Sequence, residues 1–389
     1  MPYIDQFFEV LVEQGASDLH IGEGQPPKMR KHGDVSPIRA EAVTREEAAC
    51  MLSEIAGEDA WQLFEERGDL DFAYEMDAHS RFRCNYLKQA NGYGAVFRLI
   101  PTKIASLEQL GIPCVVKEFA RWRGGLVLVT GPTGSGKSTT LAALIDYIND
   151  NFARHIVTVE EPIEFVHNNK RSLITQREVP INTESFPTGL KAALREDADI
   201  VLVGEMRDLE TISLALTAAE TGLLVFGTLH TNNARKTVDR MVDVFPASKQ
   251  AQARTMLANS LRGVVAQLLL KKTPDAGGGR IAVNEILIAS AAVSAIIREG
   301  ATQKLQDVIV AGKGQGMQFM DDAIWSLLQQ GIVSPHEAFM KAIDKNRFKP
   351  FLPAEEAHLG DAAGAAPDDE KRVPGNFVKP KAAAQLRRR

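Results

Sequence analysis

The stretch Gly131-Pro-Thr-Gly-Ser-Gly-Lys137-Ser138 stands between two segments of regular pattern. Before it, Leu126–Val129 is apolar and rich in β-branched residues, which is typical of a buried strand. After it, apolar residues recur at the spacing of one helix face: Leu141, Leu144, Ile145 and Ile148. A strand, a loop of the form G-x-x-x-x-G-K-S and a helix together are typical of a phosphate-binding loop. The stretch therefore predicts an α/β domain with a phosphate site at its centre.

The loop has the groups that a nucleoside triphosphate needs. Its glycines allow backbone N–H groups to turn inward around an anion, and the N-terminus of the following helix favours negative charge there. Lys137 is predicted to hold the β- and γ-phosphates, and Ser138 is predicted to ligate Mg²⁺. A chance glycine-rich turn is the alternative. The residues predicted to bind ATP are Gly131, Pro132, Thr133, Gly134, Ser135, Gly136, Lys137, Ser138 and Thr139.

The composition of the 389 residues narrows the range of functions. With 45 basic and 50 acidic residues the net charge is −5, which argues against general nucleic-acid binding, so no nucleic-acid partner is expected. The three cysteines are far apart and form no C-x-x-C pair, so neither a zinc site nor a disulfide framework is expected, as suits a reducing cytosol. The first ten residues lack a basic segment, and no apolar run reaches about 18 residues. We therefore expect neither a secretory signal nor a membrane span.

Changes of pattern divide the chain into four parts. Residues 1–100 mix helical and alternating strand patterns, which predicts a small α+β domain. Residues 101–113 hold two prolines and a glycine and are expected to be a linker. Residues 114–350 alternate strands and helices, which predicts a parallel sheet with helices on both faces, followed by further helices. Residues 351–389 have few large apolar side chains, so a disordered tail is predicted, and a contact of its basic end with an acidic partner is an alternative.

Polar or acidic residues follow the predicted strands of the second domain. The first strand ends in the glycine-rich loop, the second in Glu160–Glu164, the third in Gly204-Glu205 and the fourth in His230. Ligands of an open parallel sheet bind beyond the carboxyl ends of its strands, so these four ends are expected to surround one site. The strands predicted here are Leu126–Val129, His155–Val159, Ile200–Val203, Leu223–Thr228 and, as a fifth, Ile281–Ile288.

The residue types at these ends suit hydrolysis of a triphosphate. A carboxylate from Glu164 or Glu205 can orient the attacking water, and Glu205 can also ligate Mg²⁺. His230 can contact the γ-phosphate and distinguish ATP from ADP by hydrogen bonding. The alternatives are carboxylates that face water, including two of the three in Glu160–Glu164, and a histidine that is only structural.

Three arginines of the first domain are further candidates for catalysis. Arg81, Arg83 and Arg98 lie on the polar face of two predicted partner strands, Arg81–Tyr86 and Ala95–Ile100. Guanidinium groups can neutralise the charge that accumulates during phosphoryl transfer. The alternative is an ordinary solvated strand face.

With these residues in place, the chain resembles the secretion-type motor ATPases, and within them the PilT/PilU-type retraction ATPases of type IV pili. The resemblance covers roughly residues 1–347, and Gly131–Ser138 matches its first nucleotide motif. Glu164 matches the family's catalytic glutamate, in an acidic box where Glu161 stands for an aspartate. The remaining matches are the second nucleotide motif Asp199–Asp208 with Glu205, the histidine box Thr228–Asn232, and the N-terminal Ser17–His20 and Arg81–Arg83.

The resemblance implies a RecA-like ATPase domain preceded by a PAS-like domain, with ATP and Mg²⁺ as cofactors. It implies a homo-hexameric ring in which the first domain lies against a neighbouring subunit's nucleotide and lends it the arginines. The expected location is cytoplasmic and peripheral at the inner membrane. The expected partners are a pilus platform protein of that membrane and a paralogous retraction ATPase.

Two features depart from the retraction ATPases. The family's segment A-I-R-N-L-I-R-E stands here as Ala292-Val-Ser-Ala-Ile-Ile-Arg298-Glu299, and the tail beyond Pro353 is longer than a minimal retraction ATPase needs. Both keep an accessory, PilU-like role open. A pilus-assembly or type II secretion ATPase of the same fold is the alternative, although paired C-x-x-C motifs are absent. A ring scaffold that binds but does not hydrolyse nucleotide, and a recombinase-like DNA motor, are further alternatives.

Overall fold

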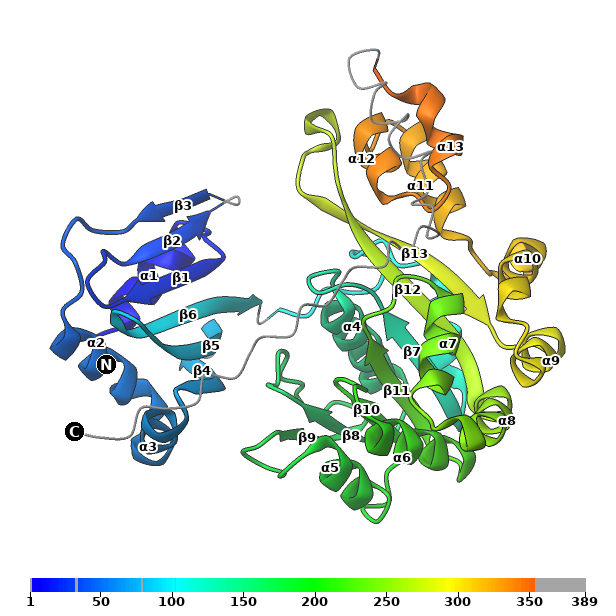
Figure 1. Cartoon of the computed structure of the whole chain (residues 1–389), viewed down its shortest axis with the longest axis horizontal. Helices are drawn as coiled ribbons and strands as arrows, with labels where there is room; N and C mark the ends of the chain where they lie inside the picture. Colours follow the sequence, from blue (N-terminus) through cyan, green and yellow to red (C-terminus); the bar gives the residue numbers. More distant parts are fainter. Residues whose placement is uncertain (1, 32–33, 78–79, 102, 354–389) are drawn as a thin grey trace, which may run out of the picture.

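The computed structural model describes residues 2–31, 34–77, 80–101 and 103–353, which build two separate sheets (Figure 1). The first sheet has six strands in the order β3-β2-β1-β6-β5-β4, and every neighbouring pair is antiparallel. Its elements are α1 (Asp5–Glu13), β1 (Asp18–Gly22), β2 (Lys28–Lys31), β3 (Asp34–Pro37), α2 (Arg45–Ala56), α3 (Glu58–Arg67), β4 (Asp69–Asp77), β5 (Ser80–Gln89) and β6 (Gly92–Pro101).

An aromatic cluster forms the core of this first part. Phe8 of α1 stacks on Phe82 of β5 with ring centroids 4.0 Å apart, and both side chains are fully buried. Along β5 the apolar side chains point into this core, while Arg81 and Arg83 lie on the opposite, partly exposed face. The alternating pattern predicted for this strand is therefore confirmed. The hairpin of β2 and β3 was not predicted because its side chains are mostly polar and only partly covered.

The second sheet has seven strands in the order β13-β12-β7-β11-β10-β8-β9. Five predicted strands are present, and β9 and β12 are additional. The strands are β7 (Gly125–Thr130), β8 (His155–Glu160), β9 (Leu173–Glu178), β10 (Ile200–Val203), β11 (Leu224–Leu229), β12 (Leu261–Lys271) and β13 (Arg280–Ile288). The predicted parallel sheet is confirmed for β12, β7, β11, β10, β8 and β9. The predicted strand Ile281–Ile288 differs, because β13 pairs antiparallel with β12 at one edge of the sheet. A short turn around three glycines, residues 277–279, joins these two strands, and a hairpin connection can only give antiparallel strands.

Helices cover both faces of this sheet, as predicted. On one face α4 and the short 3₁₀ helix η1 share a core with β7 and β11, and on the other face α6, α7 and α8 do so. Beyond β13, helices α9 and α10 pack beside α7 and α8, and helices α11, α12 and α13 pack at the end of the β12–β13 ribbon (Figure 1). The helices are η1 (Cys114–Arg121), α4 (Lys137–Asn151), α5 (Phe186–Ala193), α6 (Leu209–Glu220), α7 (Ala234–Asp243), α8 (Gln250–Ser260), α9 (Ala291–Glu299), α10 (Leu305–Ala311), α11 (Met320–Gln329), α12 (Pro335–Lys341) and α13 (Lys345–Phe348).

Two expectations about chain organisation stay predictions. The linker at residues 101–113 lies between the last strand of the first sheet and η1, and its role as a boundary is untested. Of the predicted tail 351–389, Phe351 packs against Trp325 with ring centroids 4.9 Å apart, and residues 354–389 lie outside the described residues. Within the described part of the chain, no helix combines the length and the apolar character needed to cross a bilayer.

Candidate nucleotide-binding site

The order of the strands brings the four predicted strand ends together. Strands β7, β11, β10 and β8 are consecutive neighbours in the sheet and run parallel. The glycine-rich loop, His230, Glu205 and Glu160–Glu164 follow these strands directly, so all four lie along one sheet edge. This grouping is the one that the rule for parallel sheets predicts.

The loop between β7 and α4 has backbone geometry that only glycine adopts easily. Gly131, Gly134 and Gly136 have φ values of 152°, 76° and 84°. A Cβ at Gly131 would lie 2.3 Å from the carbonyl oxygen of Gln267, so the loop presses closely against β12. The Ser135 hydroxyl is buried and has no hydrogen-bond partner among the described residues. A narrow loop in which the buried Ser135 hydroxyl has no protein partner fits the binding of a phosphate group.

Lys137 lies at the start of α4 and turns back over the loop. Its Nζ donates hydrogen bonds to the carbonyl oxygens of Gly131, at 2.9 Å, and Pro132, at 3.2 Å. Burial lowers the pKa of Lys137, while the charges of Glu205 and Glu164 act in the opposite direction. A phosphate beside this ammonium group would offset its loss of hydration, as expected for a phosphate ligand.

Glu205 is held by two neighbours at the end of β10. His230 Nε2 lies 2.8 Å from Glu205 Oε1, and Arg207 contacts both carboxylate oxygens, with 2.6 Å from Nη2 to Oε2. Burial of Glu205 raises its pKa, but the hydrogen bond and charge of Arg207, helped by His230, outweigh burial, and the pKa is lowered. The carboxylate is therefore charged at neutral pH. It also contacts His230, the histidine that the sequence predicts at the same site.

The acidic segment after β8 contributes two different carboxyl groups. Glu164 is partly exposed, and its Oε1 lies 3.7 Å from Arg83 Nη1. Glu160 instead turns inward, where its Oε1 accepts hydrogen bonds from Thr158 at 2.7 Å and Gln176 at 3.3 Å. Burial raises the pKa of Glu160 to about 7. The partly exposed Glu164 is therefore available to a ligand, whereas Glu160 is part of the floor of the site.

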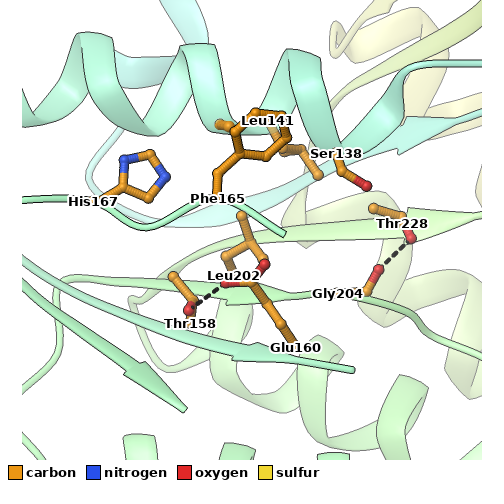
Figure 2. A pocket seen from close by; sticks show the side chains of 10 residues that line it. Ser138, Leu141, Thr158, Glu160, Phe165, His167, Leu202, Gly204 and Thr228 are labelled. Atoms are coloured by element: carbon orange, nitrogen blue, oxygen red, sulfur yellow. Dashed lines mark hydrogen bonds between the residues drawn. The ribbon is translucent and has the colours of Figure 1, made fainter. Parts of the chain in front are cut away.

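A small cavity of about 30 Å³ lies between α4 and the sheet, with room for a water molecule or two (Figure 2). Ser138 lies at one end of it, close to Thr228, whose hydroxyl donates to the carbonyl oxygen of Gly204. Glu160 and Thr158 lie on the sheet side. Within the described ranges, no group of three or more His, Cys, Asp or Glu side chains could hold a metal ion. Mg²⁺ in nucleotide sites needs only a hydroxyl or one or two carboxylates beside phosphates and water, so Ser138 and Glu205 fit that use.

A larger cavity of about 450 Å³ adjoins the outer side of the loop. Residues Pro132–Ser135 form one wall, Leu268 and Leu269 of β12 form another, and Met340 of α12 lines it as well. Basic side chains at its rim include Lys271, Arg280 and Lys341. This volume is in the range of small-ligand pockets, so it can take the base and ribose of a nucleotide whose phosphates lie at the loop.

The three arginines of the first sheet separate into two groups. Arg81 lies 3.6 Å from Glu178 of β9, and Arg83 contacts Glu164, so both reach the second sheet of their own chain. Arg98 is the direct cross-strand neighbour of Arg83, but its Nε donates to Asp18 at 2.9 Å. The structure therefore brings Arg81 and Arg83 toward the site within one subunit, and Arg98 toward the Ser17–His20 segment.

Three residues that support the site are not among the predicted site residues. Arg207 follows Glu205 by two positions, and only the fold shows that it holds this carboxylate. Glu178 anchors the acidic segment, because its Oε2 accepts the Ile163 N–H at 3.0 Å. Gln267 lies on the unpredicted strand β12 and donates to the Ser135 carbonyl at 2.6 Å. A polar residue inside the apolar run Val264–Leu270 was the one signal that could have found Gln267.

Comparison with known proteins gives consistent matches. The family described as type II/IV secretion system protein matches residues 1–306. The Pseudomonas aeruginosa type IV pilus retractation ATPase PilT is 48% identical over 339 residues, which are 87% of this chain and 98% of that protein. The type IV pilus ATPase PilU of the same organism is 37% identical, over 88% of this chain and 89% of that protein.

A solved structure agrees with these matches. The crystal structure of the pilus retraction motor PilT with bound ADP has a TM-score of 0.81 at 40% identity, and the match covers 89% of this chain and 98% of that chain. The family match takes in both the glycine-rich loop and the strand ends described above. The chain thus belongs to the type II/IV secretion system protein family, among its PilT/PilU-type members.

Proposed function

We propose that this protein is an ATP-hydrolysing motor that drives retraction of type IV pili. One observation carries the proposal: the loop with Lys137, the Glu205–His230 pair and Glu164 lie along one sheet edge in a chain that is 48% identical to a retraction ATPase. The motor acts as a hexameric ring at the cytoplasmic face of the inner membrane, where it engages the platform protein of the pilus.

Each site residue has a role in the proposed reaction. Ser138 and Glu205 would hold Mg²⁺, and the ion would supply positive charge that offsets the charge of the phosphates. Lys137 and the loop N–H groups bind the β- and γ-phosphates, and Glu205, with Glu164 nearby, orients the attacking water. His230 reaches Glu205 and can transmit loss of the γ-phosphate to the end of β11.

The identities favour retraction as the main role over an accessory one. Identity to PilT exceeds identity to PilU, 48% against 37%, over nearly the same share of this chain. The altered segment within α9 (Ala291–Glu299) is the feature that supports a PilU-like role. Absence of paired C-x-x-C motifs disfavours an assembly or type II secretion ATPase.

Deletion of the gene in its host, with pili labelled and imaged live, tests this function. We expect pili that extend but do not retract, so cells should accumulate them and lose twitching motility. Complementation with the wild-type gene should restore retraction, and complementation with Lys137→Ala should not. Cells without pili would instead indicate an assembly ATPase, and normal retraction would indicate an accessory role.

Arg81 and Arg83 are expected to serve the site of their own subunit. Their contacts with Glu178 and Glu164 lie within one chain, which does not support the expectation that they act on a neighbour's nucleotide. Replacing both by alanine should lower ATP turnover by roughly 10³-fold or more if they neutralise transferring phosphate. Arg67→Ala, an exposed arginine at the end of α3, is the matched control and should leave turnover unchanged.

Mixed rings separate the two possibilities. One subunit type carries the double arginine change and the other carries Lys137→Ala, and co-assembly is verified by differential tags. If the arginines serve their own subunit, no subunit of a mixed ring is complete and activity stays absent. Recovery of a substantial fraction of wild-type turnover would show that they act across the subunit boundary.

A further inference from the structure

Gln267 lies at the centre of a buried polar network behind the phosphate loop. It is 2% exposed and sits on β12, one position beyond the residue that pairs with Thr130 at the end of β7. Its Nε2 donates to the Ser135 carbonyl at 2.6 Å, and its Oε1 accepts from Thr140 at 2.8 Å and from Asn284 at 3.0 Å. All polar atoms of the Gln267 side chain are therefore used, and they join β12, β13, α4 and the loop.

The direction of the Ser135 carbonyl determines the direction of the next N–H group. A carbonyl oxygen only accepts hydrogen bonds, so the amide nitrogen of Gln267 must face Ser135. In a trans peptide the C=O and N–H bonds point in opposite directions. Because the Ser135 carbonyl points at Gln267, the N–H of Gly136 points away from Gln267 and from β12.

This orientation matters for anion binding because loop N–H groups are the ligands of the phosphates. Gly136 has a φ of 84°, so its peptide is not held by regular secondary structure and needs another restraint. Thr140 supplies part of that restraint from the first turn of α4, where it is 1% exposed and holds the Gln267 amide in place.

We propose that Gln267 is a positioning residue that presets the phosphate loop for nucleotide, by holding the Ser135–Gly136 peptide with its N–H turned away from β12. The proposal rests on the proposed nucleotide binding by this loop. Without the Gln267 donor, the free loop can rotate this peptide and satisfy Ser135 elsewhere. To bind nucleotide, the Ser135–Gly136 peptide must then return to its original orientation, in which the buried Ser135 carbonyl has no hydrogen-bond donor. The affinity for nucleotide therefore falls.

The test is calorimetric titration of the full chain with ADP, with and without Mg²⁺. Gln267→Met keeps the size of the side chain but can neither donate to Ser135 nor accept from Thr140 and Asn284. ADP should bind roughly 5- to 100-fold more weakly, the range expected when the buried Ser135 carbonyl is left unpaired. Asn149→Leu is the matched control, because Asn149 is equally buried at the far end of α4 and holds the backbone N–H groups of Lys170 and Ser172. It should lower the unfolding midpoint while ADP affinity stays at the wild-type value.

A second pair of variants covers the case in which Gln267→Met does not fold. Thr140→Val removes the hydroxyl that holds the Gln267 amide, and Thr140→Ser keeps it, so ADP affinity should fall for valine and be retained for serine. Wild-type ADP affinity in Gln267→Met and Thr140→Val would overturn the inference. Failure of the wild-type protein itself to bind ADP would instead overturn the proposed function.

Discussion

Lys137→Ala should abolish ATP hydrolysis, with a loss of roughly 10³–10⁵-fold, the range of a cationic group that stabilises transferring phosphate. The ammonium group of Lys137 is buried among loop carbonyls, so no other cation of the loop can take its place. Phosphate release measured on purified protein with saturating ATP gives the turnover, and an unchanged circular dichroism spectrum shows that the fold is intact.

A matched lysine elsewhere in the same domain serves as the control. Lys191 of α5 is exposed and pairs with Glu210, and Lys191→Ala should hydrolyse ATP at the wild-type rate. Turnover close to wild type in folded Lys137→Ala would contradict the assignment of the phosphate site to this loop.

Glu205→Gln should bind ATP but hydrolyse it roughly 10²–10⁴-fold more slowly, which is the usual effect of losing one general base. Glutamine has the same shape, and its one carbonyl oxygen can still accept from Arg207 Nε and His230 Nε2, whereas its NH2 group cannot accept the bond from Arg207 Nη2. The position of the side chain at the end of β10 should therefore be retained with one hydrogen bond fewer. The amide cannot take up a proton or orient water as a carboxylate does. Filter binding of ATP and single-turnover hydrolysis, measured on the same sample, separate binding from chemistry.

Glu210→Gln is the control for this change. Glu210 lies in the first turn of α6, is exposed, and pairs with the exposed Lys191, so its loss should leave turnover unchanged. Equal turnover of Glu205→Gln and wild type would place the water-orienting role elsewhere, with Glu164 as the remaining candidate at this sheet edge.

The sequence alone was sufficient for features that depend on neighbouring residues. The strand–loop–helix around Gly131–Ser138 was predictable because apolar periodicity and glycine placement are local properties of the chain. The grouping of Glu205, His230 and the acidic segment was predictable as well, because parallel strands bring their carboxyl ends to one edge. The alternating faces of β5 followed from the two-residue period of a strand.

Other features depended on contacts between distant segments, which no local pattern encodes. Gln267 donates a hydrogen bond to Ser135, which lies 132 positions earlier in the sequence. This contact exists only because β12 pairs with β7. Arg81 and Arg83 were recognisable as a polar strand face, but only the tertiary structure shows that they reach Glu178 and Glu164 of their own chain. The reversal of β13 likewise follows from its hairpin with β12. The sequence by itself therefore determined the type of site, because that depends on local spacing. Tertiary structure decided which side chains support the site, because that depends on strand order and packing.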